Sequence, residues 1–142
     1  SSNCWQFVDY GLLPQTIMDV QDVGPSLFAS KRPPYCCIIL TEPAGKRLFM
    51  EQRSKKAAVA ANKLTCFGGK REKDEDPTTC VLRECREEMG DGWCPVESEI
   101  RRACDLYVDD ILIAWFFQAS GPPNAEAVAR LQFEEGRSGV WA

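Results

Sequence analysis

Three glutamates, Glu84, Glu87 and Glu88, lie within five residues of one another and could act together on a metal ion. At spacings of i, i+3 and i+4 their carboxylates gather on one side of a helix, where like charges repel by a few tenths of a kcal/mol per pair. A hard divalent cation such as Mg²⁺ would offset that repulsion, because it binds carboxylate oxygens together with substrate phosphates. For three glutamates alone, a solvated acidic face is an equally good interpretation.

The residues before and within this helix favour a site. The pair Gly68-Gly69 precedes it and can bring a bare backbone carbonyl to an ion, since no side chain blocks the approach. Arg83 and Arg86 are spaced to hold carboxylates in a fixed orientation.

The helix itself follows from local chemistry. Asp76 is a good N-cap, Pro77 fits the first helical position, and Gly90 is the expected left-handed stop, so the sequence predicts a helix over Pro77–Met89. Its apolar residues fall at spacings that form one stripe to pack against a sheet: Val81, Leu82, Cys85 and Met89.

The whole stretch resembles the signature box of the Nudix hydrolases. The pattern G-x5-E-x7-R-E-x-x-E-E-x-G is carried by Gly69, Glu75, Arg83, Glu84, Glu87, Glu88 and Gly90. Asp91 departs from the family, which usually has an aliphatic residue after the last glycine.

The resemblance implies a Mg²⁺-dependent pyrophosphohydrolase, with Mn²⁺ as an alternative ion, that acts on a nucleoside diphosphate linked to another moiety. By position, Glu84, Glu87 and Glu88 would bind the metal with the Gly68 carbonyl as a further ligand. Arg83 would pair with a carboxylate, for which Glu75 is the candidate, and fix the loop to the helix. Glu75, Arg83, Glu87 and Glu88 are therefore the expected catalytic residues.

Candidate substrate contacts lie outside the box. Arg53 and Lys70 could bind phosphates, although each could equally be a surface charge. Glu135–Trp141 resembles the stretch before the late strand of MutT-type nucleoside triphosphatases, which makes Trp141 a candidate for the base pocket. Phe67–Lys70 also suits that group.

Two alternatives stay open. Tyr107 lies where diadenosine polyphosphate hydrolases tend to carry a tyrosine, but a tyrosine in a β-rich stretch is also common in a sheet. Some proteins with this fold bind nucleotide or RNA without turning it over, usually after losing box glutamates. All the glutamates are kept here, so we favour a small-molecule nucleoside triphosphate as the substrate.

The rest of the chain is expected to form mainly strands, before and after the helix over Pro77–Met89. We expect strands at 35–41, 47–53, 64–67, 97–107 and 111–119, a helix from Asn124 to about Leu131 and a last strand near the end of the sequence. The run 111–119 is apolar on both faces, as in the middle of a covered sheet. The pattern agrees with the α/β class, and the resemblance implies an α/β/α sandwich with a mixed β-sheet. We expect an N-terminal extension at 1–34 and a Nudix domain at 35–142.

Composition excludes several classes. A net charge of −4 over 142 residues argues against general nucleic-acid or membrane binding, which needs a basic face. No apolar run is long enough for a membrane span and no leader opens the chain, so we expect an intracellular, cytoplasmic protein. Monomer and homodimer both remain open.

Cysteine and histidine usage narrows the chemistry. The eight cysteines include no C-x-x-C pair and lie mostly in apolar stretches, which predicts reduced core thiols. There is no histidine, which excludes Ser-His or Cys-His triads and His-bound zinc. Carboxylates and a metal remain as the expected chemistry.

Overall fold

The computed structural model describes residues 5–9, for which only the backbone strand is considered, and residues 32–142. The strands are β1 (Trp5–Asp9), β2 (Tyr35–Thr41), β3 (Leu48–Gln52), β4 (Leu64–Thr65), β5 (Phe67–Lys70), β6 (Arg101–Val108), β7 (Ile111–Ser120) and β8 (Ser138–Trp141). The helices are α2 (Pro77–Met89), the short 3₁₀ helix η2 (Glu97–Glu99) and α3 (Ala125–Ala129).

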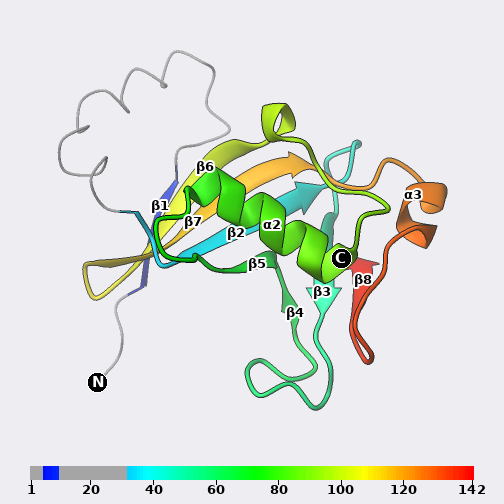
Figure 1. Cartoon of the computed structure of the whole chain (residues 1–142), viewed down its shortest axis with the longest axis horizontal. Coiled ribbons are helices and arrows are strands. Elements are labelled where there is room, and N and C mark those ends of the chain that lie inside the picture. The colour runs from blue at the N-terminus through cyan, green and yellow to red at the C-terminus, as the bar shows by residue number, and fades with distance from the viewer. Residues whose placement is uncertain (1–4, 10–31) are drawn as a thin grey trace.

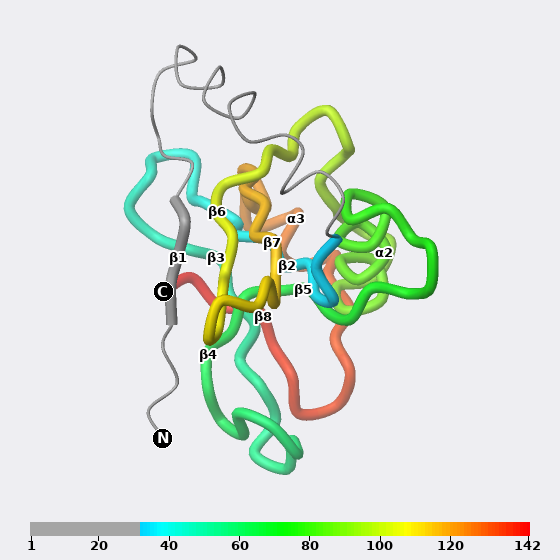
Figure 2. Tube along the Cα trace, turned by 90° about the vertical axis from the view of Figure 1, so that its left-hand side faces the viewer, coloured from blue at the N-terminus to red at the C-terminus, as the bar shows by residue number. Residues whose placement is uncertain are grey.

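The strands form one mixed sheet in the order β1-β6-β7-β2-β3-β4. Strand β2 pairs in parallel with β7 over seven residues, while β3 and β5 are antiparallel to β2 and share its other edge. Strand β8 pairs with β3. Figure 1 shows helix α2 lying across one face of this sheet, and the side view in Figure 2 separates the helix from the strands.

Helix α2 has the bounds that its caps predict. Asp76 accepts a hydrogen bond from the Thr78 N–H, and Pro77 occupies the first turn. Gly90 has the positive φ expected of a stop, 79°, but its ψ of −176° lies outside the left-handed helical region. The segment after α3 accounts for the extended ψ, because it runs beside the end of α2. There the Gln132 N–H donates a hydrogen bond to the Met89 carbonyl.

The core lies between α2 and the sheet. Alternate residues of β2, namely Cys36, Ile38 and Leu40, are fully buried. The predicted stripe of the helix is buried against them, together with Cys80. The ring of Phe49 stacks on Phe67 with centroids 5.8 Å apart.

Some predicted boundaries were wrong. Residues 97–99 form η2 and the strand begins at Arg101, because Glu99 Oε2 accepts the Val96 N–H and closes a turn. Helix α3 ends at Ala129 instead of about Leu131. Strand β1, which lies within the expected N-terminal extension, pairs with β6 and so extends the sheet. The domain division at residue 34 stays a prediction.

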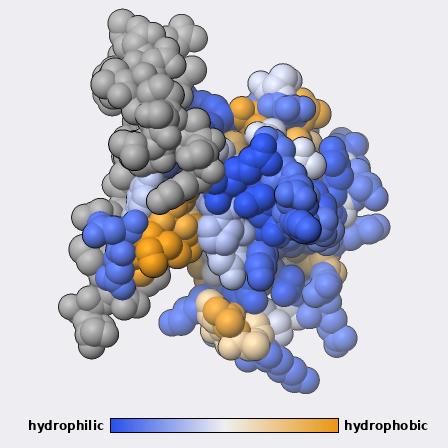
Figure 3. Space-filling view, turned by 60° about the vertical axis from the view of Figure 1, so that its left-hand side comes forward, coloured by the Kyte–Doolittle hydropathy of each residue, from blue (hydrophilic) through white to orange (hydrophobic). Residues whose placement is uncertain are grey.

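The surface on the side shown in Figure 3 is mostly hydrophilic, and hydrophobic side chains gather in small patches. Large exposed apolar side chains among the described residues include Val59 and Ile111. In that part of the chain no helix is long and apolar enough to cross a membrane. The seven described cysteines form no disulfide with one another, and Cys4 lies outside the described residues.

Candidate active site

The glycine pair brings backbone directly against two carboxylates of α2. Strand β5 holds Gly68 opposite Cys37 and Gly69 opposite Cys36. The Gly68 N–H donates to Glu88 Oε2 at 3.1 Å. A Cβ on Gly69 would lie only 2.5 to 2.7 Å from the Glu84 carboxylate atoms, so that carboxylate occupies the space that a side chain would fill.

Arg83 is the centre of the ion-pair network. Its Nε and Nη2 donate to Glu75 Oε2 and Oε1 at 2.8 and 3.0 Å, and its Nη1 donates to Glu84 Oε1 at 2.8 Å and to Glu87 Oε2 at 3.1 Å. Nη2 also donates to the Lys70 carbonyl at 3.1 Å. Arg83 therefore ties the loop before α2 to the helix, which is the contact that the family resemblance implies for Arg83 and Glu75.

The Arg83 network fixes the charge of its partners. Hydrogen bonds from Arg83 lower the pKa of Glu75 to about 2. The same bond to Glu75, helped by Glu84 and Glu87, raises the pKa of Arg83. Both groups stay ionised across the physiological range.

Glu88 has the opposite character. Burial raises the pKa of its carboxyl to about 8, with smaller contributions from the negative charges of Glu51 and Glu84, while the hydrogen bond from Gly68 acts against the rise. Glu87, one residue before it, is exposed. The predicted triad therefore divides into two carboxylates turned to the glycines, Glu84 and Glu88, and one turned to solvent.

The oxygen atoms between the glycine pair and α2 fit a hard divalent cation. In the present arrangement no three acidic, cysteine or histidine side chains among the described residues are close enough to hold a metal, because Glu84 and Glu87 bind Arg83. The groups beside the glycine pair are nevertheless the carboxylates of Glu84 and Glu88, and the lack of a side chain at Gly69 lets the Glu84 carboxylate lie against the strand. Oxygen donors of this kind suit Mg²⁺ or Mn²⁺.

Sequence reasoning missed one acidic residue, Glu51. It is 1% exposed on β3, on the same face as buried Phe49, and its charge acts on Glu88. Its partners are Thr65, Arg53 and Arg137. The signal was available, because strand alternation predicts that a residue two positions after a core phenylalanine points inward.

Of the two expected phosphate contacts, only Arg53 joins the buried cluster. Its Nη1 lies 3.7 Å from Glu51 Oε2, and its Nε donates to the Val59 carbonyl at 2.9 Å. Lys70 is exposed at the end of β5, where its carbonyl accepts the bond from Arg83.

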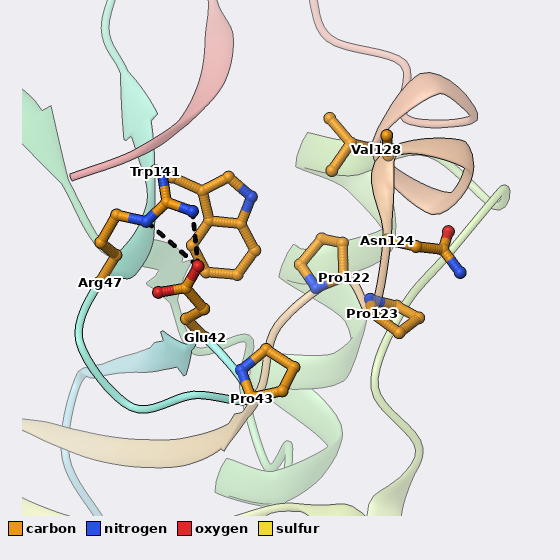
Figure 4. Close-up of a pocket in the computed structure, with 9 residues that line it drawn as sticks. Glu42, Pro43, Arg47, Pro122, Pro123, Asn124, Val128 and Trp141 are labelled. Atoms are coloured by element: carbon orange, nitrogen blue, oxygen red, sulfur yellow. Dashed lines mark hydrogen bonds and ion pairs between the residues drawn. The ribbon is translucent and has the colours of Figure 1, made fainter.

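Trp141 lines a separate pocket of about 360 Å³ (Figure 4). The remaining lining residues are Glu42, Pro43, Arg47, Pro122, Pro123, Asn124, Ala125 and Val128, and none belongs to the box. The Arg47 guanidinium lies over the indole, 5.7 Å from its centroid, and pairs with Glu42. Trp141 also packs on Phe49, with centroids 5.1 Å apart.

Tyr107 is not brought to the glutamates. It lies on β6, and β7 and β2 separate that strand from β5, whose glycines contact Glu84 and Glu88. Three strand spacings of about 4.8 Å place β6 roughly 14 Å from β5. The Tyr107 hydroxyl is buried, with no hydrogen-bond partner in the described part of the chain, so it is embedded in the sheet region.

Comparisons with solved structures identify the fold. A MutT structure from work on Aliivibrio salmonicida and Vibrio cholerae is 20% identical with a TM-score of 0.58, covering 79% of this chain and 80% of the other. MutT from Methanosarcina mazei Go1 is 18% identical with a TM-score of 0.52, covering 79% and 78%. A MutT/nudix family protein from Enterococcus faecalis is 15% identical with a TM-score of 0.52, covering 92% of this chain and 51% of the other.

At these identities the likeness supports the fold, which is the α/β sandwich with a mixed sheet that the sequence predicts. A search of curated protein sequences found no match. A sequence model of the NUDIX domain matches residues 31–135, which is most of the chain and includes the entire box. This chain therefore belongs to the Nudix family and is a Nudix hydrolase.

Proposed function

We propose that this Nudix hydrolase cleaves a phosphoanhydride bond in a nucleoside diphosphate linked to another moiety, with a nucleoside triphosphate as the preferred substrate and Mg²⁺ as the ion. Nudix hydrolases act on small nucleotides, and the family generally uses divalent metal ions. The observation that carries the proposal is the approach of Glu84 and Glu88 to the Gly68-Gly69 backbone, with all box glutamates retained.

Glu84, Glu87 and Glu88 would hold the ion, with the Gly68 carbonyl as a further ligand. When bound, Mg²⁺ or Mn²⁺ would neutralise phosphate oxygens and lower the pKa of a water molecule. The chain's own residues supply the positioning. Arg83 and Glu75 fix the loop against the helix, and the Gly68 N–H orients Glu88 through Oε2.

Half-buried Glu88 is suited to move a proton. Its carboxyl has a pKa of about 8 without metal, close to the pH at which a general base works best. Glu87 is exposed and can reach solvent. Arg53 and Lys70 are proposed phosphate contacts, and Trp141 is the proposed aromatic wall for the base.

The diadenosine polyphosphate alternative has less support. It requires Tyr107 as an exposed stacking platform, whereas its hydroxyl is buried and its strand lies away from the glutamates. The non-catalytic alternative has no supporting feature either, since the box glutamates are retained.

The test is Glu88→Gln, assayed with Mg²⁺ on nucleoside triphosphates, sugar nucleotides and dinucleoside polyphosphates. Turnover should fall at least about a hundredfold, which corresponds to about 2.7 kcal/mol of barrier. Circular dichroism should show an unchanged fold. Glu126→Gln, on the exposed surface of α3, is the matched control and should keep full activity. Full activity in folded Glu88→Gln protein would defeat the proposal.

A further inference from the structure

Glu51 is a buried carboxylate between two arginines that come from different parts of the chain. Arg53 approaches it from the end of β3, with Nη1 3.7 Å from Oε2, and Arg137 approaches from the turn before β8, with Nε 3.4 Å from Oε1. Thr65 also donates to Oε2 at 3.3 Å. Among the residues that the structure describes, none donates a hydrogen bond to Oε1, although Glu51 is only 1% exposed.

These contacts are longer than those of a close buried ion pair. Charge-assisted N–H···O bonds normally close to about 2.7 to 2.9 Å, and a buried carboxylate is costly unless its partners are close. The bond between Arg83 and Glu75, at 2.8 Å, shows what such a pair looks like in this protein. Glu51 therefore holds Arg53 and Arg137 while some of their N–H groups remain available to another acceptor.

Each arginine keeps an unused donor. Nε of Arg53 binds the Val59 carbonyl, and Nη1 of Arg137 lies 3.7 Å from an exposed carboxylate, that of Glu134. Within the described residues, neither Nη2 group donates a hydrogen bond. Both side chains are about one-quarter exposed, at 23% and 26%, so a ligand in solvent can reach them.

These donors lie beside the candidate active site. The charges of both Glu51 and Arg137 act on Glu88. A hollow of about 490 Å³ lies beside the two arginines, and its lining comes from their chain neighbours: Ser54, Lys55 and Lys56 after Arg53, and Glu135 and Gly136 before Arg137. The two lysines and the one glutamate leave the lining with a net positive charge.

We infer that Arg53 and Arg137 form a two-arginine site for the phosphate chain of the substrate, and that Glu51 is the positioning residue that holds them together. A guanidinium binds phosphate oxygens through paired N–H groups. One carboxylate between two guanidiniums reduces their mutual repulsion and leaves one net positive charge for the anion. The inference deepens the proposed function and rests on it, because it names the residues that would bind the phosphates.

Binding of inorganic tripolyphosphate tests the site without requiring turnover. Isothermal titration calorimetry in Mg²⁺ buffer should show Arg137→Ala binding tripolyphosphate at least tenfold more weakly than the unmodified protein. Arg137→Lys should recover only part of the loss, since lysine lacks the fork of donors. Arg130→Ala is the matched control: Arg130 is exposed after α3, carries the same charge and should leave binding unchanged.

A double-mutant cycle tests the role of Glu51. Glu51→Gln keeps the shape but cannot bridge two cations, so it should weaken tripolyphosphate binding several-fold. If Glu51 acts through the arginines, the loss in Glu51→Gln/Arg137→Ala should be clearly smaller than the product of the two single losses. Independent effects, or unchanged binding in Arg137→Ala, would overturn the inference. Arg137 is partly exposed on a turn, so its variant answers the question even where Glu51→Gln fails to fold.

Kinetics separate this inference from the proposed function. On a nucleoside triphosphate, Arg137→Ala should raise KM about tenfold while kcat changes less than about threefold. An inactive Glu88→Gln protein together with an unchanged KM in Arg137→Ala would refute the arginine site and leave the hydrolase proposal intact. Loss of tripolyphosphate binding in Arg137→Ala would still support the arginine site if Glu88→Gln proved fully active.

Discussion

The guanidinium of Arg83 binds both carboxylate oxygens of Glu75, eight residues earlier in the chain, at 2.8 and 3.0 Å. The same guanidinium reaches Glu84 and Glu87, so one side chain orients the loop and the acidic face of α2 together. Because lysine cannot bind a carboxylate in this two-pronged way, Arg83→Lys should reduce kcat/KM on the order of a hundredfold, the cost of small misplacements at a reaction centre. Arg86→Lys, one turn away on the exposed side, is the control and should change little. Equal activity of the two variants would contradict a positioning role for Arg83.

Alanine substitutions of the two glycines of the box should have different effects. Gly69→Ala puts a Cβ against the Glu84 carboxylate, the movable end of a side chain, so it should keep the fold and displace Glu84. Gly68→Ala puts a Cβ 2.3 Å from the Cys36 carbonyl oxygen at a φ of +141°, where backbone must move. We expect Gly68→Ala to lose about 3 kcal/mol of stability or more, and Gly69→Ala to lose activity at nearly unchanged Tm. Thermal melts and turnover assays of both proteins check the contrast, which the reverse pattern would refute.

Glu88 should make stability depend on pH when metal is removed with EDTA. Its pKa is raised to about 8, so between about pH 4.5 and pH 8 the folded state holds a proton that the unfolded state has released. The unfolded state binds fewer protons there, so the free energy of unfolding should decrease as pH rises, by up to about 1.4 kcal/mol per unit.

Glu88→Gln provides the control, because it removes this slope. The difference between the two proteins isolates Glu88 from Glu75, whose lowered pKa affects stability only below about pH 4.5. Denaturant titrations at several pH values measure it. Parallel pH profiles for the two proteins would show that Glu88 titrates normally.

Among the described residues, the buried hydroxyl of Tyr107 finds no hydrogen-bond partner. Removing an unsatisfied buried group relieves its desolvation cost, so Tyr107→Phe should raise stability by about 1 kcal/mol and leave turnover unchanged. Tyr35→Phe, with 43% of the residue exposed, is the matched control and should leave stability unchanged. A selective loss of dinucleoside polyphosphate hydrolysis in folded Tyr107→Phe or Tyr107→Ala would instead favour a stacking role.

The thiols should differ in reactivity. A hydrogen bond from Cys85 lowers the pKa of half-buried Cys94, whereas burial raises the pKa of Cys37 to about 12. Brief treatment of the folded protein with iodoacetamide should therefore modify Cys94 before the other described cysteines, because the thiolate is the reacting form. Peptide mass spectrometry identifies the site, and preferential labelling of Cys37 would contradict the order. The Tm should not change in reductant.

Features that depend on residues close together in the chain could be predicted from the sequence, whereas contacts between distant segments could not. Helix α2 and the pairing of Arg83 with Glu75 depend on residues close together in the chain, and both match the structure. The start of β6 was missed because a local turn at Val96 competes with strand pairing. The partners of Glu51 could not be deduced, since Arg137 lies 86 positions away and meets it only when β8 pairs with β3.

The parallel pairing of β2 with β7 also constrains how this protein acquires its structure. Tyr35 lies opposite Ala114, so the central contact of the sheet joins segments about 80 positions apart. Closing so long a loop costs entropy before any contact is gained, and proteins dominated by such contacts fold slowly. During synthesis, β2 must wait until β7 has left the ribosome. Helix α2 is complete well before that moment, so the acidic helix must remain without its full sheet until late in folding.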